Sequence, residues 1–168
     1  MNIKPATIIL LITFFTNCKI NYSFTGASIA PEVKTVSVKT FPNIAPLINP
    51  LLSNKLTEEL KDRFMSQTNL QIVQSYGDLQ FEGTILGYSI RPMNIQAGSD
   101  QAAQNRLTIK VKVKFINKVD SKLNYETTFS RYSDYSTDKN FQDVENLLVE
   151  DIVKQLVTDI FNKAVVNW

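Results

Sequence analysis

The clearest pattern along the chain is a strict alternation of polar and apolar residues over residues 105–117, NRLTIKVKVKFIN. Successive side chains of a β-strand point to opposite faces of a sheet, so this period predicts a strand with one buried and one exposed face. The buried face would carry Leu107, Ile109, Val111, Val113 and Phe115. The exposed face would carry Arg106, Thr108, Lys110, Lys112 and Lys114.

Three further segments have the composition of strands. Residues 33–41, VKTVSVKTF, are rich in β-branched residues and end before Pro42. Residues 78–90 alternate, which would place Leu79, Phe81, Gly83, Ile85 and Gly87 on one face and Gln80, Glu82, Thr84, Leu86 and Tyr88 on the other. Residues 122–135 begin with Leu123, Tyr125, Thr127 and Phe129 on one side. We expect these last strands to pair as antiparallel hairpins, and we expect the polar segment 91–104 to be a loop.

Two segments have a helical period. The first should run from about Pro50 to Ser66 with Asn49 as its N-cap, because apolar residues recur there every four positions, at Leu52, Leu56, Leu60 and Phe64. The second begins after Asn140, another good N-cap, and continues to the end of the sequence. Its apolar stripe consists of Phe141, Val144, Leu148, Ile152, Leu156, Ile160 and Ala164.

The order of elements predicts the fold class. A β-α-β-β-β-α order with one-sided strands indicates an α+β two-layer sandwich, in which two helices pack on one face of a mainly antiparallel four-stranded sheet. The face that carries the lysines would be turned outward. At 168 residues the chain is long enough for one such domain, which we place at residues 33–168.

The first residues have a different character. Lys4 is the only charged residue before Lys19, and an apolar run of about ten residues follows it, too short to span a membrane and typical of an export signal. The run ends at Cys18, the only cysteine. This thiol could be buried in a core, act as a nucleophile, form an intermolecular disulfide, or carry lipid.

The stretch Phe15-Thr16-Asn17-Cys18 resembles the lipobox of bacterial lipoproteins, although Phe15 and Asn17 stand where that pattern has leucine and a small residue. The resemblance implies a signal peptide at residues 1–17, lipid attachment at Cys18 and a lipidated tether at residues 18–32. Two or more acyl chains would anchor the protein stably in a membrane. The alternative is a conventional signal peptide that leaves Cys18 as a free thiol.

The composition argues against an enzyme. There is no histidine, and the single cysteine is at the N-terminus, which removes the commonest general base, thiol catalysis and most transition-metal sites. No phosphate-binding glycine loop or Gly-x-Ser-x-Gly turn is present. After removal of residues 1–17 the chain has 17 basic and 16 acidic residues, so no general attraction to nucleic acid is expected. We expect no catalytic residue, no metal and no cofactor.

The unusual surface feature is the row of cations Arg106, Lys110, Lys112 and Lys114 on one predicted strand face. One interpretation is a solvated face whose charge is relieved by carboxylates on neighbouring strands, and which discourages edge pairing. The other is a binding surface for a phosphorylated lipid or an acidic partner. The aromatic residues Tyr125, Phe129, Tyr132 and Tyr135 pose a similar choice between sheet packing and a partner surface.

Several segments in this order resemble the LptE family of lipopolysaccharide-assembly lipoproteins. They are the lipobox-like cysteine, YSFTGAS, FPNIAPLINPLLSNKLTEELKDRFMSQTNL, GDLQFEGTILGYSI, RLTIKVKVKF, FSRYSD and DIFNKAVVNW. The resemblance implies a non-enzymatic protein, anchored by lipid to the periplasmic face of the Gram-negative outer membrane. It also implies a plug inside an LptD-type β-barrel that assists lipopolysaccharide transport to the cell surface, with the basic row as the candidate site for lipopolysaccharide or the barrel. The alternatives are a periplasmic lipid-binding carrier, which would need an apolar cavity between sheet and helices, and a structural envelope lipoprotein.

Overall fold

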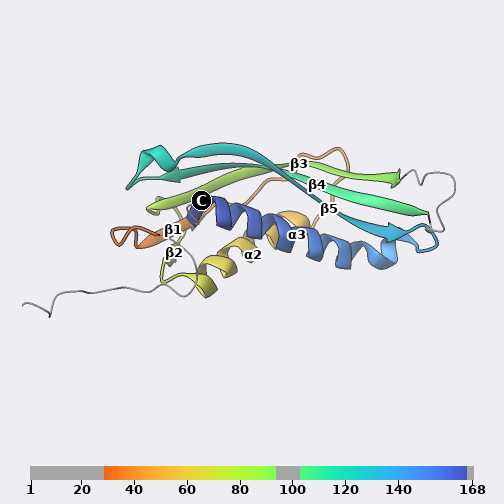
Figure 1. The fold of residues 1–168 in the computed structure, drawn as a ribbon, viewed down its shortest axis with the longest axis horizontal. Helices are drawn as coiled ribbons and strands as arrows, with labels where there is room; N and C mark the ends of the chain where they lie inside the picture. The colour runs from red at the N-terminus through yellow and green to blue at the C-terminus, as the bar shows by residue number, and fades with distance from the viewer. Residues whose placement is uncertain (1–28, 94–102, 166–168) are drawn as a thin grey trace, which may run out of the picture.

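The computed structural model describes residues 29–93 and 103–165, in which a β-sheet lies over a layer of two helices (Figure 1). The elements are β1 (Thr35–Val38), α2 (Leu52–Gln67), β2 (Gln71–Val73), β3 (Leu79–Met93), β4 (Gln104–Asn117), the short 3₁₀ turn η2 (Ser121–Leu123), β5 (Tyr125–Ser136) and α3 (Phe141–Val165). The expected α+β class, with both helices on one side of the sheet, is confirmed. Cys18, the signal peptide, most of the tether and Trp168 lie outside the described residues.

The sheet has five strands in the order β2-β1-β3-β4-β5, not the four that we expected. β3, β4 and β5 form an antiparallel meander, whereas β1 is parallel to both β2 and β3. Parallel pairing of β1 and β2 is possible because α2 connects them and returns the chain to the starting end of the sheet. The sequence analysis did not predict β2, because three residues are too few for an alternation to be recognised.

A β-bulge in β3 changes which side chains face the core. The pairing with β4 shifts between Ile85 and Gly87, so Leu86 is an extra residue and the alternation inverts beyond it. Tyr88 is consequently buried, with 3% of its surface exposed, and our assignment of Tyr88 to the outer face is wrong. The sequence carries a signal of this inversion that our assignment did not use, because the large apolar residues stand at odd positions up to Ile85 and at even positions, Leu86, Tyr88 and Ile90, beyond it.

Close packing explains the glycine at position 83. A Cβ built on Gly83 would lie 2.4 Å from the backbone oxygen of Lys112 and 2.4 Å from the ring of Phe41. No side chain fits in that space without moving a strand or the ring. Gly83 therefore lets Phe41 pack directly against the backbone of β3 in the core.

The strands differ in length from the expected ones. β3 continues to Met93 and β4 begins at Gln104, so residues 91–93 and 104 of the segment expected to be a loop belong to strands. β1 is shorter than expected, with four residues. Hydrogen bonds to Asp78 hold the start of this strand in place. One carboxylate oxygen of Asp78 accepts hydrogen bonds from the backbone amides of Lys34 and Thr35 and from the Thr35 hydroxyl, at 2.8 to 2.9 Å.

Helix α2 begins at Leu52, two residues later than expected, with Leu51 at its N-cap position, and Asn49 caps the turn that leads into it. The side-chain Oδ1 of Asn49 accepts hydrogen bonds from the backbone amides of Leu51 and Leu52 at 3.0 and 3.1 Å. Its Nδ2 donates to Oε1 of Glu145 on α3 at 2.8 Å, and the buried hydroxyl of Tyr88 donates to the same oxygen at 2.5 Å. This carboxylate therefore ties both helices to the bulged part of β3.

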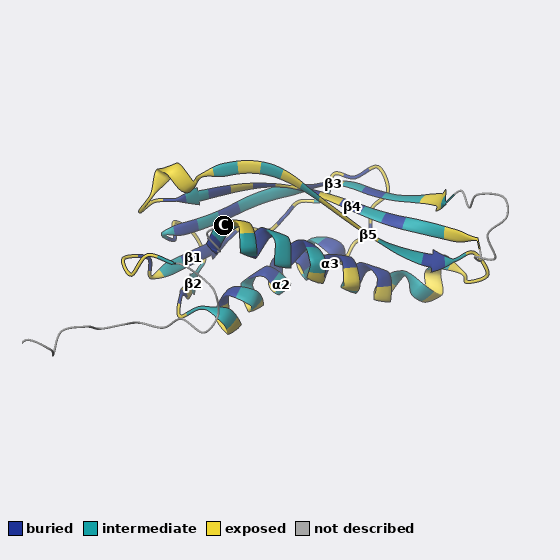
Figure 2. Cartoon of the chain, viewed as in Figure 1, coloured by how far each residue is buried: buried dark blue, intermediate teal, exposed yellow. Residues whose placement is uncertain are grey.

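The two helices run in the same direction, side by side. Lys55 of α2 contacts Glu150 of α3 at 3.4 Å, and further along Arg63 contacts Thr158 at 3.2 Å. The buried residues of both helices, dark in Figure 2, belong to the same core cluster as those of the inner face of the sheet. The solvent therefore meets the outer face of the sheet on one side and the outer sides of α2 and α3 on the other.

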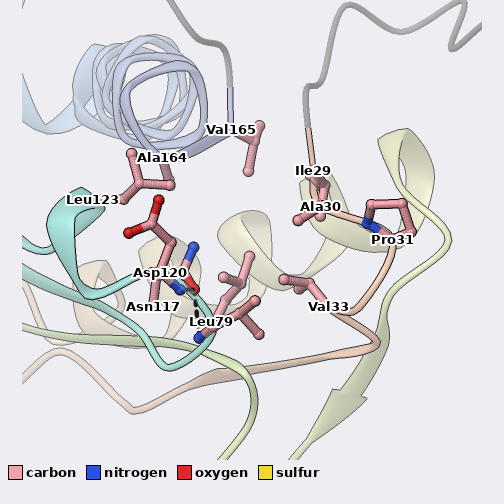
Figure 3. A pocket seen from close by; sticks show the side chains of 11 residues that line it. Ile29, Ala30, Pro31, Val33, Leu79, Asn117, Asp120, Leu123, Ala164 and Val165 are labelled. Carbon is pink, nitrogen blue, oxygen red and sulfur yellow. Dashed lines mark hydrogen bonds between the residues drawn. The ribbon is translucent and has the colours of Figure 1, made fainter.

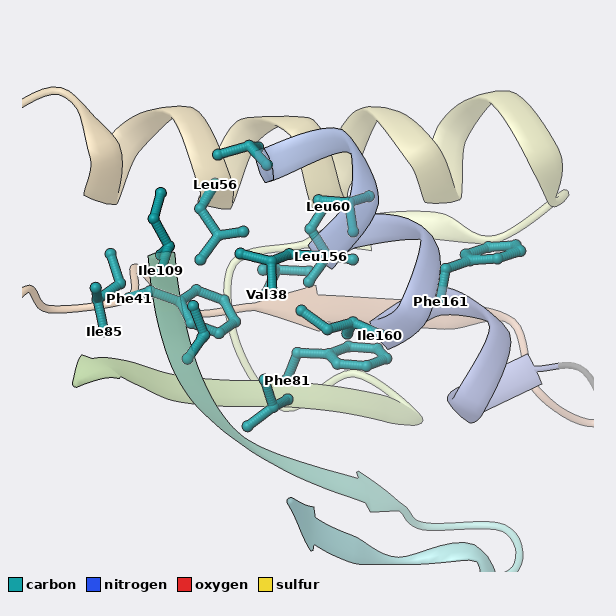
Figure 4. Packing of buried hydrophobic residues seen from close by; sticks show 14 of the residues in the cluster. Val38, Phe41, Leu56, Leu60, Phe81, Ile85, Ile109, Leu156, Ile160 and Phe161 are labelled. Atoms are coloured by element: carbon teal, nitrogen blue, oxygen red, sulfur yellow. The ribbon is translucent and has the colours of Figure 1, made fainter. Parts of the chain in front are cut away.

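The core fills the space between the layers (Figure 4). Four phenylalanine rings form a chain of contacts across it, with Phe64 against Phe161 and Phe81 at 5.0 and 5.1 Å between ring centroids, and Phe81 against Phe115 at 4.9 Å. All five residues predicted for the buried face of β4 are buried. Packing of this kind accounts for most of the stability of such a domain.

Candidate binding surface on the outer face of the sheet

The predicted basic row lies on the outer face of the sheet, along β4. Lys110, Lys112 and Lys114 are exposed and alternate with buried residues, as the sequence indicated. Arg106 shares this face but is half-buried. The structure therefore places all four residues on one strand face, but their neighbours differ, and the neighbours decide which of them could bind a ligand.

Arg106 is held by its neighbours on β5. Its guanidinium donates two hydrogen bonds to the carboxylate of Asp134, at 2.7 and 2.8 Å, and lies over the Tyr132 ring at 3.5 Å from the centroid. The bonds to Arg106 hold the pKa of Asp134 below its ordinary value. A bidentate pair with a stacked aromatic ring is strong for a surface contact, so Arg106 acts mainly in holding β4 to β5.

Lys112 and Lys114 stand beside carboxylates. Lys112 forms an ion pair with Glu126 of β5, and the hydrogen bond from Lys112 lowers the pKa of Glu126. Lys114 lies in register between Glu82 of β3 and the same Glu126. Glu82 pairs with Lys39 at 2.5 Å. Lys114 forms no salt bridge of its own among the described residues, because these two glutamates pair with Lys39 and Lys112, but both carboxylates lie beside it.

Lys110 has a different environment. Its cross-strand neighbours are Gly87 on β3 and Ser130 on β5, neither of which is charged. In the described part of the chain no carboxylate lies within salt-bridge distance of Lys110. Because Gly87 has no side chain, the stem of Lys110 can lie across β3. Lys110 is therefore the cation on this face best placed to donate hydrogen bonds to an external anion.

The sequence analysis missed one cation of this surface. Arg91 lies directly opposite Arg106 across the β3–β4 ladder and is exposed. The sequence analysis assigned Arg91 to the polar segment expected to be a loop, but Arg91 belongs to β3, in which Pro92 lies opposite Asn105. Like charges facing each other across strands repel, and an anion bound between them would relieve that repulsion. The candidate surface therefore extends from Lys110 toward Arg91.

The aromatic residues divide between the two faces of β5. Tyr125 and Phe129 pack against the core, and Tyr135 is buried against Phe141 at 5.8 Å. Tyr132 is the exception, because it lies on the outer face and half of its surface is exposed. Packing is therefore the role of three of the four, and Tyr132 supports Arg106.

A cavity of about 320 Å³ lies at the end of the domain where the chain enters β1 (Figure 3). Ile29, Val33 and Leu79 face it from one side and Leu123 and Val165 from the other. Side chains of Asn117 and Asp120 also line it, and the Asn117 Oδ1 accepts from the Asp120 backbone amide at 2.9 Å. This hollow therefore lies at one end of the domain, between Leu79 of β3 and Val165 of α3, and its lining includes no residue of α2.

Metal sites and membrane-spanning helices are both absent from the part of the chain that the structure describes. Residues 29–93 and 103–165 contain no cluster of side chains that could hold a metal ion. No helix within the same ranges is long and apolar enough to cross a bilayer.

Solved structures share this fold at low sequence identity. A hypothetical protein from Chlamydia trachomatis gives a TM-score of 0.55 at 10% identity, over 80% of this chain and 99% of that chain. An uncharacterised lipoprotein B from Nitrosomonas europaea gives 0.51 at 13% identity, over 86% and 87% of the two chains. Rare lipoprotein B from Shewanella oneidensis gives 0.50 at 15% identity, over 77% and 92%. At these identities the comparisons show a common fold.

No match is found among curated proteins. The model of one protein family, described as LptE, lipopolysaccharide-assembly, matches residues 33–164. This match covers most of the chain and agrees with the resemblance seen in the sequence segments. The chain therefore belongs to the LptE family of lipopolysaccharide-assembly proteins.

Proposed function

We propose that this protein is a non-enzymatic lipoprotein of the outer membrane that binds and plugs an LptD-type β-barrel and assists lipopolysaccharide transport to the cell surface. The observation that carries the proposal is the family match over residues 33–164. In this proposal Cys18 carries the lipid, residues 18–32 form the tether, and the domain lies at the periplasmic face of the membrane. About 14 extended residues could span up to roughly 45 Å between the lipid and the domain.

The shape and polarity of the domain support the plug. Its outer sheet face carries lysines, glutamates and hydroxyl side chains, which suit the polar, water-filled interior of a wide barrel. Its core is densely filled, so the domain can act as a rigid body. A plug needs both properties.

Lipopolysaccharide is the proposed ligand of the outer sheet face. Its phosphate groups would accept charge-assisted hydrogen bonds from Lys110 and from the guanidinium of Arg91, with Lys114 and Lys112 contributing less because glutamates compete for them. Arg106 orients the strands beneath this site. The lipid-carrier alternative would need a larger apolar cavity than the hollow at the end of the domain, and the buried core cluster occupies the centre between the layers.

Purification of the native lipidated protein tests the proposal. An antibody would recover it from detergent-solubilised outer membrane without altering either end, and mass spectrometry would identify what accompanies it. We expect an LptD-type barrel in near-equal amount. Recovery of the protein alone, or with lipid and no barrel, would refute the plug function. As a control, Cys18→Ala should leave the domain folded and release it from the membrane.

A further inference from the structure

The cavity at the end of the domain where the chain enters β1 has an apolar floor and an apolar rim (Figure 3). We call it the end hollow. Val33, Leu79 and Val165 form its floor and are buried, with 4%, 2% and 2% of their surfaces exposed. On its rim, Leu123 and Val119 leave 42% and 45% of their surfaces exposed. An apolar group that entered the end hollow would leave water and gain packing contacts, both of which are favourable.

The end hollow is large enough for one aromatic side chain. Its volume is about 320 Å³. An apolar cavity of about 150 Å³ in another protein holds a benzene molecule, so this volume has room for an indole. Asp120 adds a carboxylate to the lining, whose Oδ1 accepts a hydrogen bond from the Lys122 amide at 3.0 Å. A carboxylate has lone pairs for further donors, and the N–H of a buried indole usually finds such a partner.

The chain has a tryptophan at a spacing that suits this cavity. Ala164 and Val165, the last two described residues of α3, both line the end hollow. Trp168, the only tryptophan of the sequence, follows them by four and three positions. Residues three and four positions apart share a helix face, so one more turn of α3 would bring Trp168 to the side of the helix that carries Ala164 and Val165. Only residues 166–168 have to become ordered for this.

The segment that precedes the domain reaches the opposite wall of the end hollow. Residues 29–31 line it, and the Val33 amide donates to the Ala30 oxygen at 3.0 Å, which closes a turn there. Phe24, the nearest aromatic residue on this side, stands five positions before that wall. Its side chain enters only if five residues become ordered, which costs more conformational entropy than ordering three. Trp168 is therefore the better occupant.

We infer that the end hollow is the docking site of residues 166–168 of the same chain, with the indole of Trp168 inside it. The indole would contact the end of α3 on one side and residues 29–31 on the other, so it would join the last helix to the base of the tether. The fit of the indole does not depend on the proposed function, but its use does. If Cys18 carries the lipid, a tether held at its base leaves the domain in a fixed direction and orients the domain relative to the membrane.

Intrinsic fluorescence of the full-length lipidated protein tests this inference. The chain has one tryptophan, so the tryptophan emission comes from Trp168 alone. Leu123→Asp places a short charged side chain on the rim of the end hollow, and Leu47→Asp is the matched control outside it, at positions that are 42% and 50% exposed. Because both positions are exposed, both variants should fold, which circular dichroism would verify.

We expect the emission of Trp168 to lie at a shorter wavelength than that of free tryptophan, and acrylamide to quench it roughly threefold less. Leu123→Asp should abolish both effects, and Leu47→Asp should leave them unchanged. Trp168→Ala should speed hydrogen exchange of the Val33 amide roughly tenfold, because this amide belongs to the wall that the indole would cover. Exchange of the Ile44 amide, which bonds to β3 away from the end hollow, should stay as it is.

Emission and quenching equal to those of free tryptophan would overturn the inference. Protection that persists in Leu123→Asp would also overturn it, since detergent or another surface would then shield Trp168. Protection that is lost on dilution, with a dimer seen by light scattering, would overturn it in favour of a second copy. Faster exchange at Val33 in Phe24→Ala, and not in Trp168→Ala, would give the end hollow to the tether. None of these results changes the recovery of an LptD-type barrel, so the proposed function is judged separately.

Discussion

Replacement of Glu145 by leucine should destabilise the domain strongly although the residue lies outside the apolar core. One carboxylate oxygen of Glu145 accepts hydrogen bonds from Tyr88 and Asn49, whose exposed fractions are 3% and 9%. A hydrogen bond to a charged group contributes about 1.5 to 3 kcal/mol, and a buried donor left without a partner costs about 1 to 3 kcal/mol. Glu145 is itself only half-buried, so we take the lower half of these ranges and expect a loss of about 3 kcal/mol.

Urea unfolding at neutral pH measures this loss, with an unchanged slope showing that the folded state stays compact. The same change should lower the melting temperature by roughly 10 °C in a domain of this size. Asn146→Leu is the matched control, because it makes the same residue at the next, exposed position of α3. We expect that change to stay within about 0.5 kcal/mol of the wild type.

A double-mutant cycle shows whether the Tyr88 hydroxyl is the cause. Tyr88→Phe removes the donor, so Glu145→Leu should cost about 1 kcal/mol less in that background, since no buried hydroxyl is then left without a partner. The reasoning is refuted if Glu145→Leu alone costs less than about 0.5 kcal/mol, or if the two changes are additive. A small cost would mean that water replaces the carboxylate without loss, and additive changes would mean that the Tyr88 hydroxyl is not the cause of the destabilisation.

Three further predictions follow from the strands. Lys110→Glu should weaken lipopolysaccharide binding at low salt by about tenfold, and Lys114→Glu by only a few-fold because glutamates already flank it; equal losses in a binding titration would contradict the assignment. Backbone amides hold the pKa of Asp78 below its usual value, so its contribution to stability is present above about pH 4 and is lost as the pH falls through the lowered pKa. Asp78→Asn should therefore be less stable than the wild type at pH 6 in urea unfolding, and the difference should shrink at pH 2.5. Gly83→Ala should cost about 2 kcal/mol or more because its Cβ would lie 2.4 Å from backbone, whereas Gly87→Ala, where the Cβ meets a flexible lysine stem at 3.4 Å, should cost under 1 kcal/mol.

The parts of the fold that the sequence predicts are those encoded locally. The alternation along residues 105–117 places every apolar side chain of β4 correctly, because each residue in a regular strand is related to its neighbours by a fixed geometry. The cap at Asn49 is likewise visible, since its side chain bonds to amides two and three residues ahead. The parallel pairing of β2 is not visible, because it depends on which strand lies alongside, and the change of apolar parity at Leu86 becomes a bulge only when β4 pairs on both sides of it.

In the candidate site, too, the sequence predicts local features but not those that depend on strand pairing. The sequence places four cations on one face of β4, but it does not reveal which of them are neutralised. Arg106 is paired because Asp134 occupies the opposite position in β5, and Lys110 is unpaired in the described residues because Gly87 and Ser130 occupy its two flanks. These identities follow from the register of three strands, which hairpin length and the β3 bulge determine together.

The position of β1 has a consequence for the order in which the domain forms. The meander of β3, β4 and β5 closes over short distances along the chain, whereas β1 pairs with β3 through residues as far apart as Val36 and Leu79. Contacts of low sequence separation form first, so the meander should be an early structure and insertion of β1 between its two parallel neighbours a late step. The segment that leads toward Cys18 would then join the sheet last, and hydrogen exchange should find the earliest opening of the native state at this strand.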